Sequence, residues 1–441
     1  MAKKIRFETV EFSKITPGGQ AIGELEDGKK CFAWGVLPGE KAIIQITKNK
    51  STFCEGYAVE ILKESPHRIQ PVDSDSYLST SPWQILNFTF EQKTKEELIL
   101  ESFRQEKIAL EQQPFYSGSE IFNYRNKVEF SFWYEKNENS EEEGQLNLAF
   151  FRRGGRGKVP VKGTSLAKKE INQAGQKVLK ILQNRKTFAK DLKTLLIRSN
   201  QKGDITAQLY VKDANFKLLY GKEINSLGNN FKCFEIIYSN PKSPASVITE
   251  RLQTIGERNL SDEILGINFN YATEGFFQIN LPVYQKALED MSKFIDKDKE
   301  TVDLYSGVGS IGLTIGKGNL KLIEINPFAV EEMKNNIARL NIANAEAILS
   351  PSEKALEYIS NKANLIVDPP RAGMDKKVCE KILEVEPEKI IYLSCNVSTQ
   401  ARDVAILSQK YDIIYSKGYN FFPRTPHIEN LVILKLKKEY R

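Results

Sequence analysis

A cysteine at the end of an apolar run is the first residue whose type and position could carry chemistry. In IIYLSCNVSTQARD, residues 390–403, four apolar or aromatic residues lead directly into Ser394, Cys395 and Asn396, and a polar, helix-like segment follows. Open α/β sheets place their reactive groups at the carboxyl ends of such strands. A thiolate there is a strong nucleophile, but cysteine is also a common small residue of protein cores. The pattern leaves both interpretations of Cys395 open.

A glycine loop between an expected strand and helix is the second candidate site. VDLYSGVGSIGL, residues 302–313, places Gly307, Gly309 and Gly312 in GxGxxG spacing, and Glu324 follows 17 positions after Gly307 at the end of the next expected strand. Glycines permit a tight turn close to a ligand, and the carboxylate can accept both hydroxyls of a ribose. The loop fits a dinucleotide as well as S-adenosylmethionine, and a glycine turn without a ligand is the third interpretation.

An acid followed by two prolines distinguishes these ligands. NLIVDPPRAG, residues 364–373, is a strand pattern that ends in Asp368, Pro369 and Pro370. Two prolines cannot continue a ladder, so the chain must leave the sheet and present Asp368 at its carboxyl edge. A nicotinamide dehydrogenase has no need of this corner, whereas methyltransferases that act on planar nitrogenous rings commonly carry a related one. The corner therefore favours a methyltransferase.

The elements that must position these residues alternate between strand and helix from about residue 266 onward. A helix is expected at 327–341, and strands are expected at 300–305, 320–325, 345–349, 363–367, 389–394, 412–416 and 430–436. This alternation predicts a largely parallel sheet wrapped by helices. The last two strands are joined by a short loop without a helix, so they should form an antiparallel closing hairpin.

Two regions of different pattern precede this α/β region. Residues 1–65 alternate short apolar runs with turns, which predicts a small all-β barrel, and residues 66–265 are mixed α+β. In the mixed region we expect a helix over 95–113 and a strand over 124–136, whose apolar faces would carry Leu98, Phe103 and Leu110 and then Val128, Phe130 and Phe132. The expected domains are therefore 1–65, 66–265 and 266–441.

Composition limits the classes of protein. Hydrophobic content of 41% and charged content of 27% describe an ordinary globular chain. Positive charge near the N-terminus has no apolar run behind it, so neither secretion nor membrane insertion is expected. Five cysteines without a CxxC pair indicate a reducing, cytoplasmic compartment, and two histidines make a histidine metal site or a Ser/His triad unexpected. We expect no metal.

A basic stretch is a candidate nucleic-acid contact. FFRRGGRGKVPVKG, residues 150–163, contains no acid, and its cations are Arg152, Arg153, Arg156, Lys158 and Lys162. Clustered cations beside aromatic residues suit phosphates and stacked bases. A solvated hairpin turn is the alternative interpretation.

Taken in order, several motifs resemble those of the RNA uracil-5-methyltransferase family. They are YRNKVEF (124–130), FFQIN (276–280), DLYSGVGSIGL, VDPPRAG, YLSCNVSTQARD and PHIENLVIL. Residues 1–65 resemble a TRAM domain, an OB-like RNA-binding barrel. The resemblance implies a Rossmann-like class I methyltransferase domain that uses S-adenosylmethionine to methylate carbon 5 of a uridine in RNA. The TRAM-like barrel favours 23S ribosomal RNA over tRNA, and we expect a monomer.

The resemblance also implies roles for single residues. Gln278 would contact S-adenosylmethionine, Tyr305 would lie against it, and Glu324 would hold its ribose within reach of Gly307 and Gly309. Asp368 would line the pocket shared by the cofactor and the base. Cys395 would add to carbon 6 of uracil, and Glu429, at the start of the last strand, would remove the proton from carbon 5. His427 could orient the glutamate or the substrate, or be a solvent-facing structural residue.

Two departures from the family pattern stand out. Many members hold an iron–sulfur cluster, but the corresponding stretches here, SDSYLSTSPWQILNF (74–88) and GTSLAKKEI (163–171), contain no cysteine. Four thiolates at the expected spacing are therefore lacking, and we expect no cluster. Val397 stands where members usually have proline, a change that should only soften the turn.

Alternative functions make different demands on these residues. An RNA cytosine-5 methyltransferase would typically carry a second cysteine beside the proline of the acid–proline corner, and none is present. A nicotinamide oxidoreductase would leave Cys395 and Glu429 without a role. An RNA-binding protein without activity would explain the barrel and the basic stretch but not the catalytic set. A tRNA uridine-5 methyltransferase stays the main alternative to a ribosomal RNA enzyme.

Overall fold

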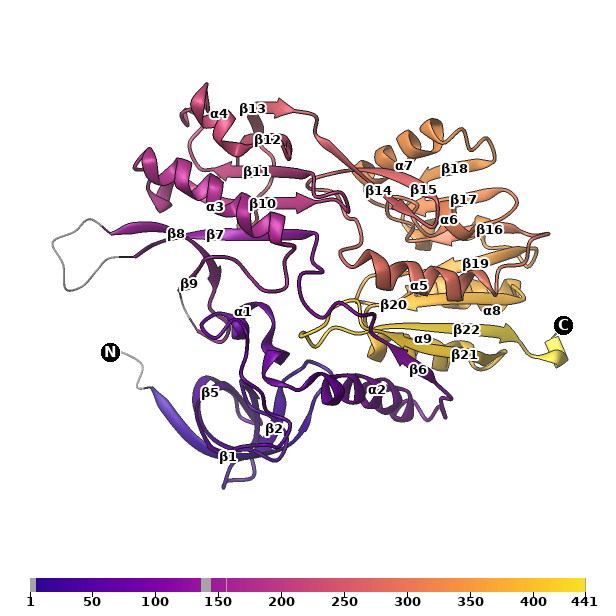
Figure 1. The fold of residues 1–441 in the computed structure, drawn as a ribbon. Coiled ribbons are helices and arrows are strands. Elements are labelled where there is room, and N and C mark those ends of the chain that lie inside the picture. Colours follow the sequence, from indigo (N-terminus) through magenta and orange to yellow (C-terminus); the bar gives the residue numbers. More distant parts are fainter. Residues whose placement is uncertain (1–4, 136–143, 156, 441) are drawn as a thin grey trace. The chain divides into compact units, whose positions relative to one another are not determined.

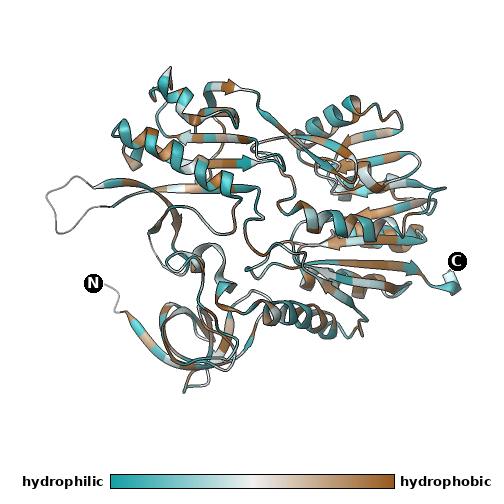
Figure 2. Ribbon diagram, viewed as in Figure 1, coloured by the Kyte–Doolittle hydropathy of each residue, from teal (hydrophilic) through white to brown (hydrophobic). Residues whose placement is uncertain are grey.

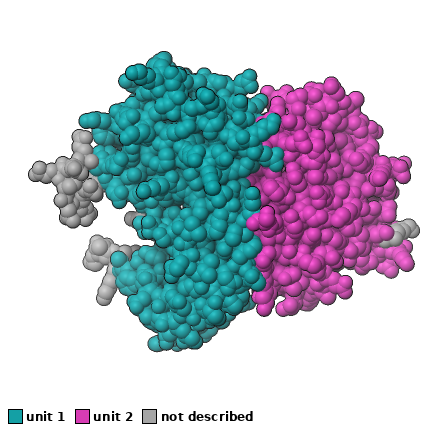
Figure 3. All heavy atoms as spheres, in the orientation of Figure 1, with its two compact units in different colours: residues 1–91, 120–260, 424–426 teal, residues 92–119, 261–423, 427–441 magenta. Residues whose placement is uncertain are grey.

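The computed structural model describes residues 5–135, 144–155 and 157–440. The described residues form two compact units (Figure 3). Unit 1 takes in residues from 1–91, 120–260 and 424–426, and unit 2 takes in residues from 92–119, 261–423 and 427–441. The division into domains at 65 and 265 stays a prediction.

Unit 2 contains the expected α/β sheet (Figure 1). Its strand order is β18-β17-β16-β19-β20-β22-β21-β6. The parallel strands are β16 (Glu300–Leu304), β17 (Leu320–Glu324), β18 (Ala345–Leu349), β19 (Ala363–Val367) and β20 (Lys389–Ser394). β21 (Tyr411–Tyr419) and β22 (Glu429–Leu436) form the expected antiparallel hairpin, and β22 is also antiparallel to β20. The Rossmann-like fold class is confirmed.

Helices follow the parallel strands and expose polar faces, whereas the central strands are largely apolar (Figure 2). They are α6 (Gly312–Ile315), α7 (Pro327–Arg339), α8 (Lys376–Val385) and α9 (Val397–Leu407), and α5 (Leu281–Ser292) precedes the first of these strands. α7 begins where expected because the Asn326 side chain accepts from the Phe328 N–H and Pro327 occupies the first turn. It ends two residues before the expected 341, where Asn341 adopts a left-handed φ of 53°. In β19 every residue is buried, as a strand covered on both faces requires.

The expected helix over 95–113 is wrong at both ends. α2 spans Phe88–Gln105, and Lys107 then turns the chain with φ 62°. Leu98 and Phe103 are buried on this helix as expected, but Leu110 lies outside it. The following segment forms β6 (Gln113–Tyr116), which pairs with β21 in parallel at the edge of the sheet. Helical periodicity cannot reveal this pairing, because β21 lies some three hundred residues further along the chain.

Unit 1 contains the expected barrel. β1 (Arg6–Ile15), β2 (Ala21–Glu24), β3 (Lys30–Trp34), β4 (Lys41–Asn49) and β5 (Phe53–Lys63) close in the order β1-β2-β3-β5-β4. Its interior is filled by apolar side chains and two cysteines, including Val10, Phe12, Cys31, Ile44 and Cys54. Because closure pairs every strand on both sides, the barrel has no free edge.

The rest of unit 1 is a second sheet covered by α3 (Lys169–Asn184) and α4 (Lys222–Leu227). Its strands, in spatial order, are β13 (Glu250–Gly256), β12 (Phe231–Tyr238), β11 (Ile205–Val211), β10 (Leu192–Ser199), β7 (Lys127–Glu135), β8 (Gln145–Phe151) and β9 (Lys158–Val161). β7 buries Val128, Phe130 and Phe132 as expected. The short α1 (Tyr77–Thr80) and the pair β14 (Asn259–Ile264) and β15 (Ile267–Ala272) complete the fold. No helix among the described residues has the length and apolarity needed to cross a bilayer.

Candidate active site

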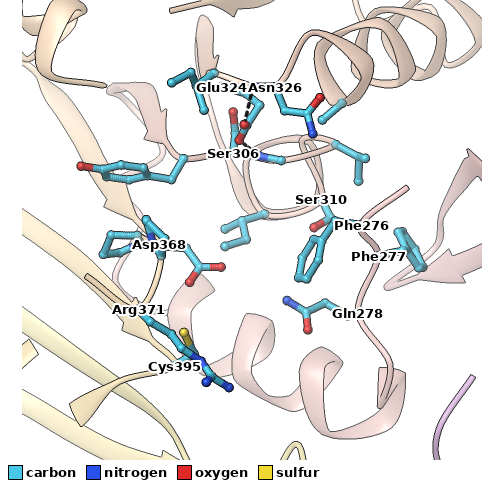
Figure 4. Close-up of a pocket in the computed structure, with 18 of the residues that line it drawn as sticks. Phe276, Phe277, Gln278, Ser306, Ser310, Glu324, Asn326, Asp368, Arg371 and Cys395 are labelled. Carbon is cyan, nitrogen blue, oxygen red and sulfur yellow. Dashed lines mark hydrogen bonds between the residues drawn. The ribbon is translucent and has the colours of Figure 1, made fainter. Parts of the chain in front are cut away.

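A cavity of 730 Å³ lies at the carboxyl edge of the sheet in unit 2 (Figure 4). Loops that follow β16, β17, β19 and β20 line it, because parallel strands deliver their following loops to one edge. The lining includes the predicted residues Gln278, Tyr305, Gly307, Glu324, Asp368, Cys395 and Glu429, together with His427. The predicted Gly309 does not line it. Gly309 has φ 81°, and a Cβ there would lie 2.9 Å from Met333, so backbone conformation and packing explain this glycine.

The glycine loop and Glu324 form one hydrogen-bonded unit. The N–H of Gly307 donates to Oε2 of Glu324 at 2.9 Å, and the N–H of Asn326 donates to Oε1 at 2.8 Å. These bonds fix the carboxylate, and each oxygen keeps further acceptor capacity for a ligand hydroxyl. A Cβ on Gly307 would meet nothing within 4 Å, so the loop leaves open space beside the carboxylate. This arrangement fits a ribose-containing ligand.

Cys395 and Glu429 reach the cavity from neighbouring strands. Cys395 directly follows β20, and Asn396 caps the N-terminus of α9 by accepting from the Ser398 N–H. Glu429 is the first residue of β22, which pairs with β20 through the partners Ser394 and Asn430. Cys395 is partly exposed, whereas the other four cysteines, all within the described residues, are buried. Partial exposure to a cavity is the setting that a nucleophile needs.

The family of the chain follows from its sequence as a whole. The profile described as "tRNA (Uracil-5-)-methyltransferase" matches residues 88–437. The chain belongs to this family. It is accordingly an RNA methyltransferase, and the recognition made from its motifs is confirmed.

Relatives of this methyltransferase match nearly all of its length. An RNA methyltransferase of Lactobacillus johnsonii, whose own function is uncharacterised, is 28% identical over 97% of this chain and 96% of that protein. Another RNA methyltransferase, from Fusobacterium nucleatum, is 28% identical over 97% of this chain and 95% of that protein. The crystal structure of Pyrococcus abyssi tRNA (uracil-54, C5)-methyltransferase in complex with S-adenosyl-L-homocysteine shares the fold, with a TM-score of 0.75 and 20% identity over 96% of this chain and 99% of that one.

Burial and like charge raise the pKa values of three groups that line the cavity of the methyltransferase. Burial, with the neighbouring carboxyls of Glu429 and Asp368, raises the pKa of the Cys395 thiol to about 12, and Arg371 opposes this rise. Burial raises the pKa of Asp368 to about 7. Burial and Asp368 raise the pKa of Glu429 well above its ordinary value. At neutral pH the Cys395 thiol is therefore largely protonated before substrate binds, and burial favours the neutral form of Glu429.

Two residues of this site were not singled out from the sequence. Asp303, at the end of β16, accepts from the Gly312 N–H at 2.9 Å beneath the glycine loop, and burial raises its pKa to about 8. Arg371 lines the cavity directly after the two prolines. Both lie inside quoted motifs, DLYSGVGSIGL and VDPPRAG, but no local pattern separates them from structural residues.

The predicted basic stretch is only partly available to a ligand. Arg153 donates from Nε to the carbonyl of Leu78 at 2.7 Å, and its guanidinium lies 4.6 Å from the ring centre of Trp34. Lys158 donates to the carbonyl of Phe132 at 2.9 Å. These two side chains tie the β8–β9 hairpin to its surroundings in unit 1. Arg152 and Lys162 are exposed, and Arg156 lies outside the described residues.

The two stretches without cysteine are joined by polar side chains. Asp73 accepts from Gln84 Nε2 at 3.1 Å, from Thr164 Oγ1 at 3.1 Å and from Ser165 Oγ at 2.9 Å. Gln84 also donates to Ser81 Oγ and Ser165 Oγ. Within the described residues no group of three or more His, Cys, Asp or Glu is placed to hold a metal ion. The absence of an iron–sulfur cluster stays a prediction.

Proposed function

We propose that this methyltransferase transfers a methyl group from S-adenosylmethionine to carbon 5 of a uridine in RNA through a covalent adduct with Cys395. The observation that carries the proposal is the meeting of a thiol, a buried carboxyl and a glycine loop with a fixed carboxylate in one cavity. Neither a cofactor site without a nucleophile nor a binding surface needs all three groups.

The residues present fit S-adenosylmethionine as the methyl donor. Glu324 would accept the ribose hydroxyls beside Gly307, and Gln278 and Tyr305 would contact the rest of the donor. Burial raises the pKa of Tyr305 to about 12, so its hydroxyl stays neutral and keeps its proton. Bound there, the donor supplies a methyl group on a positively charged sulfur.

Carbon 5 of uracil is too weak a nucleophile to accept a methyl group unaided. The Cys395 thiol loses its proton to water, and the thiolate forms a bond to carbon 6 while the electrons of the carbon 5–carbon 6 double bond move onto the ring oxygen. Carbon 5 of the resulting enolate would then bond to the methyl group, and the sulfur of the donor would leave with both electrons of its bond to that methyl. The ionised Glu429 then removes the proton from carbon 5, the double bond re-forms, and the thiolate is expelled.

Substitutions of Cys395 and Glu429 should fail at different steps. Cys395→Ala should bind RNA yet form no covalent complex, because the attacking atom is absent. Glu429→Gln should form the adduct, transfer the methyl group and stall, because the amide cannot take the carbon 5 proton. Denaturing electrophoresis with RNA and S-adenosylmethionine should show a persistent protein–RNA band for Glu429→Gln alone, and the double variant should lose it. Turnover by Cys395→Ala would remove Cys395 from the mechanism.

The uridine lies in 23S ribosomal RNA in this proposal, with tRNA as the second candidate. The TRAM-like barrel is what favours ribosomal RNA. The Pyrococcus abyssi enzyme, which acts on uracil-54 of tRNA, nevertheless shares its fold over 96% of this chain. The residues outside this match are too few to make up the barrel, so the match includes at least part of it. A barrel therefore supports binding of RNA more strongly than it supports one class of RNA.

A further inference from the structure

The charges around the cavity are strongly unbalanced. Its described lining residues include the carboxyl groups of Glu324, Glu353, Asp368 and Glu429, and Arg371 is the one Lys or Arg among them. A thiolate formed in such a cavity faces carboxyl groups that disfavour it once they ionise. Arg371 is therefore the lining cation that opposes these carboxyl groups and favours the thiolate.

Arg371 is attached to both segments that carry the reactive groups. Its carbonyl accepts from Asn396 Nδ2 at 2.8 Å and from Thr399 Oγ1 at 3.2 Å, so its backbone is tied to the turn that carries Cys395. Its Nη2 lies 3.3 Å from Nδ1 of His427, two residues before Glu429. A guanidinium can donate to the neutral imidazole at this distance. The Arg371 and Cys395 side chains overlap in the view of Figure 4, and the Arg371 charge lowers the pKa of the Cys395 thiol.

We propose that Arg371 is a positioning residue that acts through Cys395: its guanidinium, oriented by His427, stabilises the thiolate and so sets the rate at which the sulfur attacks. The inference rests on the proposed function for its biological meaning, because only a covalent mechanism needs the thiolate. It also gives His427 a role, that of orienting the guanidinium through the contact between Nδ1 and Nη2.

The groups that face the thiol act in opposite directions. Asp368, after β19, and Glu429, at the start of β22, raise the pKa of Cys395, and Arg371 lowers it. Removal of the Arg371 charge should therefore raise that pKa further and reduce the thiolate fraction at every pH below it. A lysine keeps the charge but lacks the planar fork that can face the sulfur and His427 together, so it should substitute only in part.

Alkylation of Cys395 by iodoacetamide tests this without RNA or a methyl donor. The thiol proton goes to water, the thiolate bonds to the carbon and iodide leaves, so the rate follows the thiolate fraction. We would measure the rate on the Cys395 peptide of the full-length protein by mass spectrometry between pH 7.5 and 10.5. Burial of the other cysteines makes Cys395 the accessible thiol among the described residues.

Arg371→Gln should slow alkylation of Cys395 at least about tenfold at pH 8, which corresponds to a pKa raised by about one unit. Arg371→Lys and His427→Gln should shift the profile in the same direction by less. Arg402→Gln is the matched control, because Arg402 pairs with Asp403 at 2.6 Å on the same helix α9 and does not line the cavity. The alkylation rate of Cys395 in Arg402→Gln should stay within about twofold of the rate in the parent protein at each pH.

If Cys395 of Arg371→Gln is alkylated at the same rates as in the parent protein, the inference is overturned. It is also overturned if Arg402→Gln slows alkylation of Cys395 as much as Arg371→Gln does. A parental profile for His427→Gln would remove His427 from it. The outcome is independent of the adduct experiment. If alkylation shifts as expected while Glu429→Gln never traps RNA, the proposed function fails and the electrostatic role of Arg371 stands.

Discussion

Asp303 shows how a residue that does not line the cavity can shape it. Its Oδ2 accepts from the Gly312 N–H, and its Oδ1 has no hydrogen-bond partner among the described residues. A Cβ on Gly312 would lie 2.9 Å from Oδ2, so the glycine lets the loop approach the carboxyl this closely. Burial is the first cause of the raised pKa of Asp303, about 8, and the carboxyls of Asp368 and Glu324 add to it.

The raised pKa makes stability depend on pH. The folded protein holds a proton on Asp303 up to about pH 8, whereas the unfolded chain releases it near pH 4. Between these values the folded state binds more protons, so this group costs stability as pH rises, by up to about 1.4 kcal/mol per pH unit. Asp303→Asn should lack this slope. Urea unfolding of the parent protein and of Asp303→Asn at pH 6, 7 and 8 measures the free energy of unfolding of each. If this free energy changes equally with pH in both proteins, the raised pKa of Asp303 is contradicted.

At the scale of elements, α2 supports the loop that leads to Glu429. Lys95 is fully buried on α2, and its Nζ donates to Asn420 Oδ1 at 2.7 Å and to the carbonyl of Phe422 at 3.1 Å. Phe422 lines the cavity and contacts the ring of His427, with 5.6 Å between ring centres. A helix from the N-terminal half of the chain thus helps to hold the active-site loop.

Lys95→Met should destabilise the protein and slow methylation together. It removes a donor from the buried Asn420 side chain and from the partly buried carbonyl of Phe422, and loss of a hydrogen bond at a buried acceptor costs about 1–3 kcal/mol. Lys93→Met on the same helix is the control, because Lys93 pairs with Glu97 at an exposed position, and this substitution should change stability by less than about 0.5 kcal/mol. Urea midpoints and initial methylation rates measure both effects, and equal midpoints for the two variants would refute the supporting role.

The β8–β9 hairpin should contribute to RNA capture through its exposed cations. Arg152→Gln with Lys162→Gln should weaken RNA binding and reduce the slope of log affinity against log salt by about 0.7–0.9 for each phosphate that the hairpin no longer neutralises. Lys202→Gln with Lys217→Gln removes the same charge from exposed positions elsewhere in unit 1 and should leave the slope nearly unchanged. Filter binding over a salt series compares them. Equal slopes for both pairs would exclude the hairpin from the interface.

At the scale of the whole molecule, the class of RNA is the property that the fold leaves open. In the proposed function the barrel and the second sheet would contact the RNA backbone, and backbone contacts carry little sequence information. Under the proposed mechanism, selection of one uridine would require that the base be exposed to the Cys395 thiol, by flipping if the base is stacked.

Loss of 5-methyluridine in a deletion strain should identify the substrate. We expect 23S ribosomal RNA to lose the modification and tRNA to retain it, and the Cys395→Ala gene should fail to restore it. Mass spectrometry of nucleosides from each purified RNA measures this directly. Loss from tRNA alone would make the tRNA interpretation correct, and loss from neither would refute the substrate assignment.

The sequence by itself determined the local parts of the site. The glycine loop, the acid–proline corner and the cysteine at the end of β20 each depend on a short stretch whose residue types restrict the backbone, so they could be placed without a structure. The alternation of strands and helices likewise predicted the parallel sheet and its closing hairpin.

Only the tertiary structure decided which distant segments meet at the site and how deeply its side chains are buried. The pairing of β22 with β20 brings Glu429 beside Cys395, and β6 joins β21 from the other half of the chain. The contact between Arg371 and His427 and the use of Arg153 as an internal tie also join residues far apart in sequence. The raised pKa values follow from desolvation, which depends on every neighbouring element and is therefore invisible in any single motif.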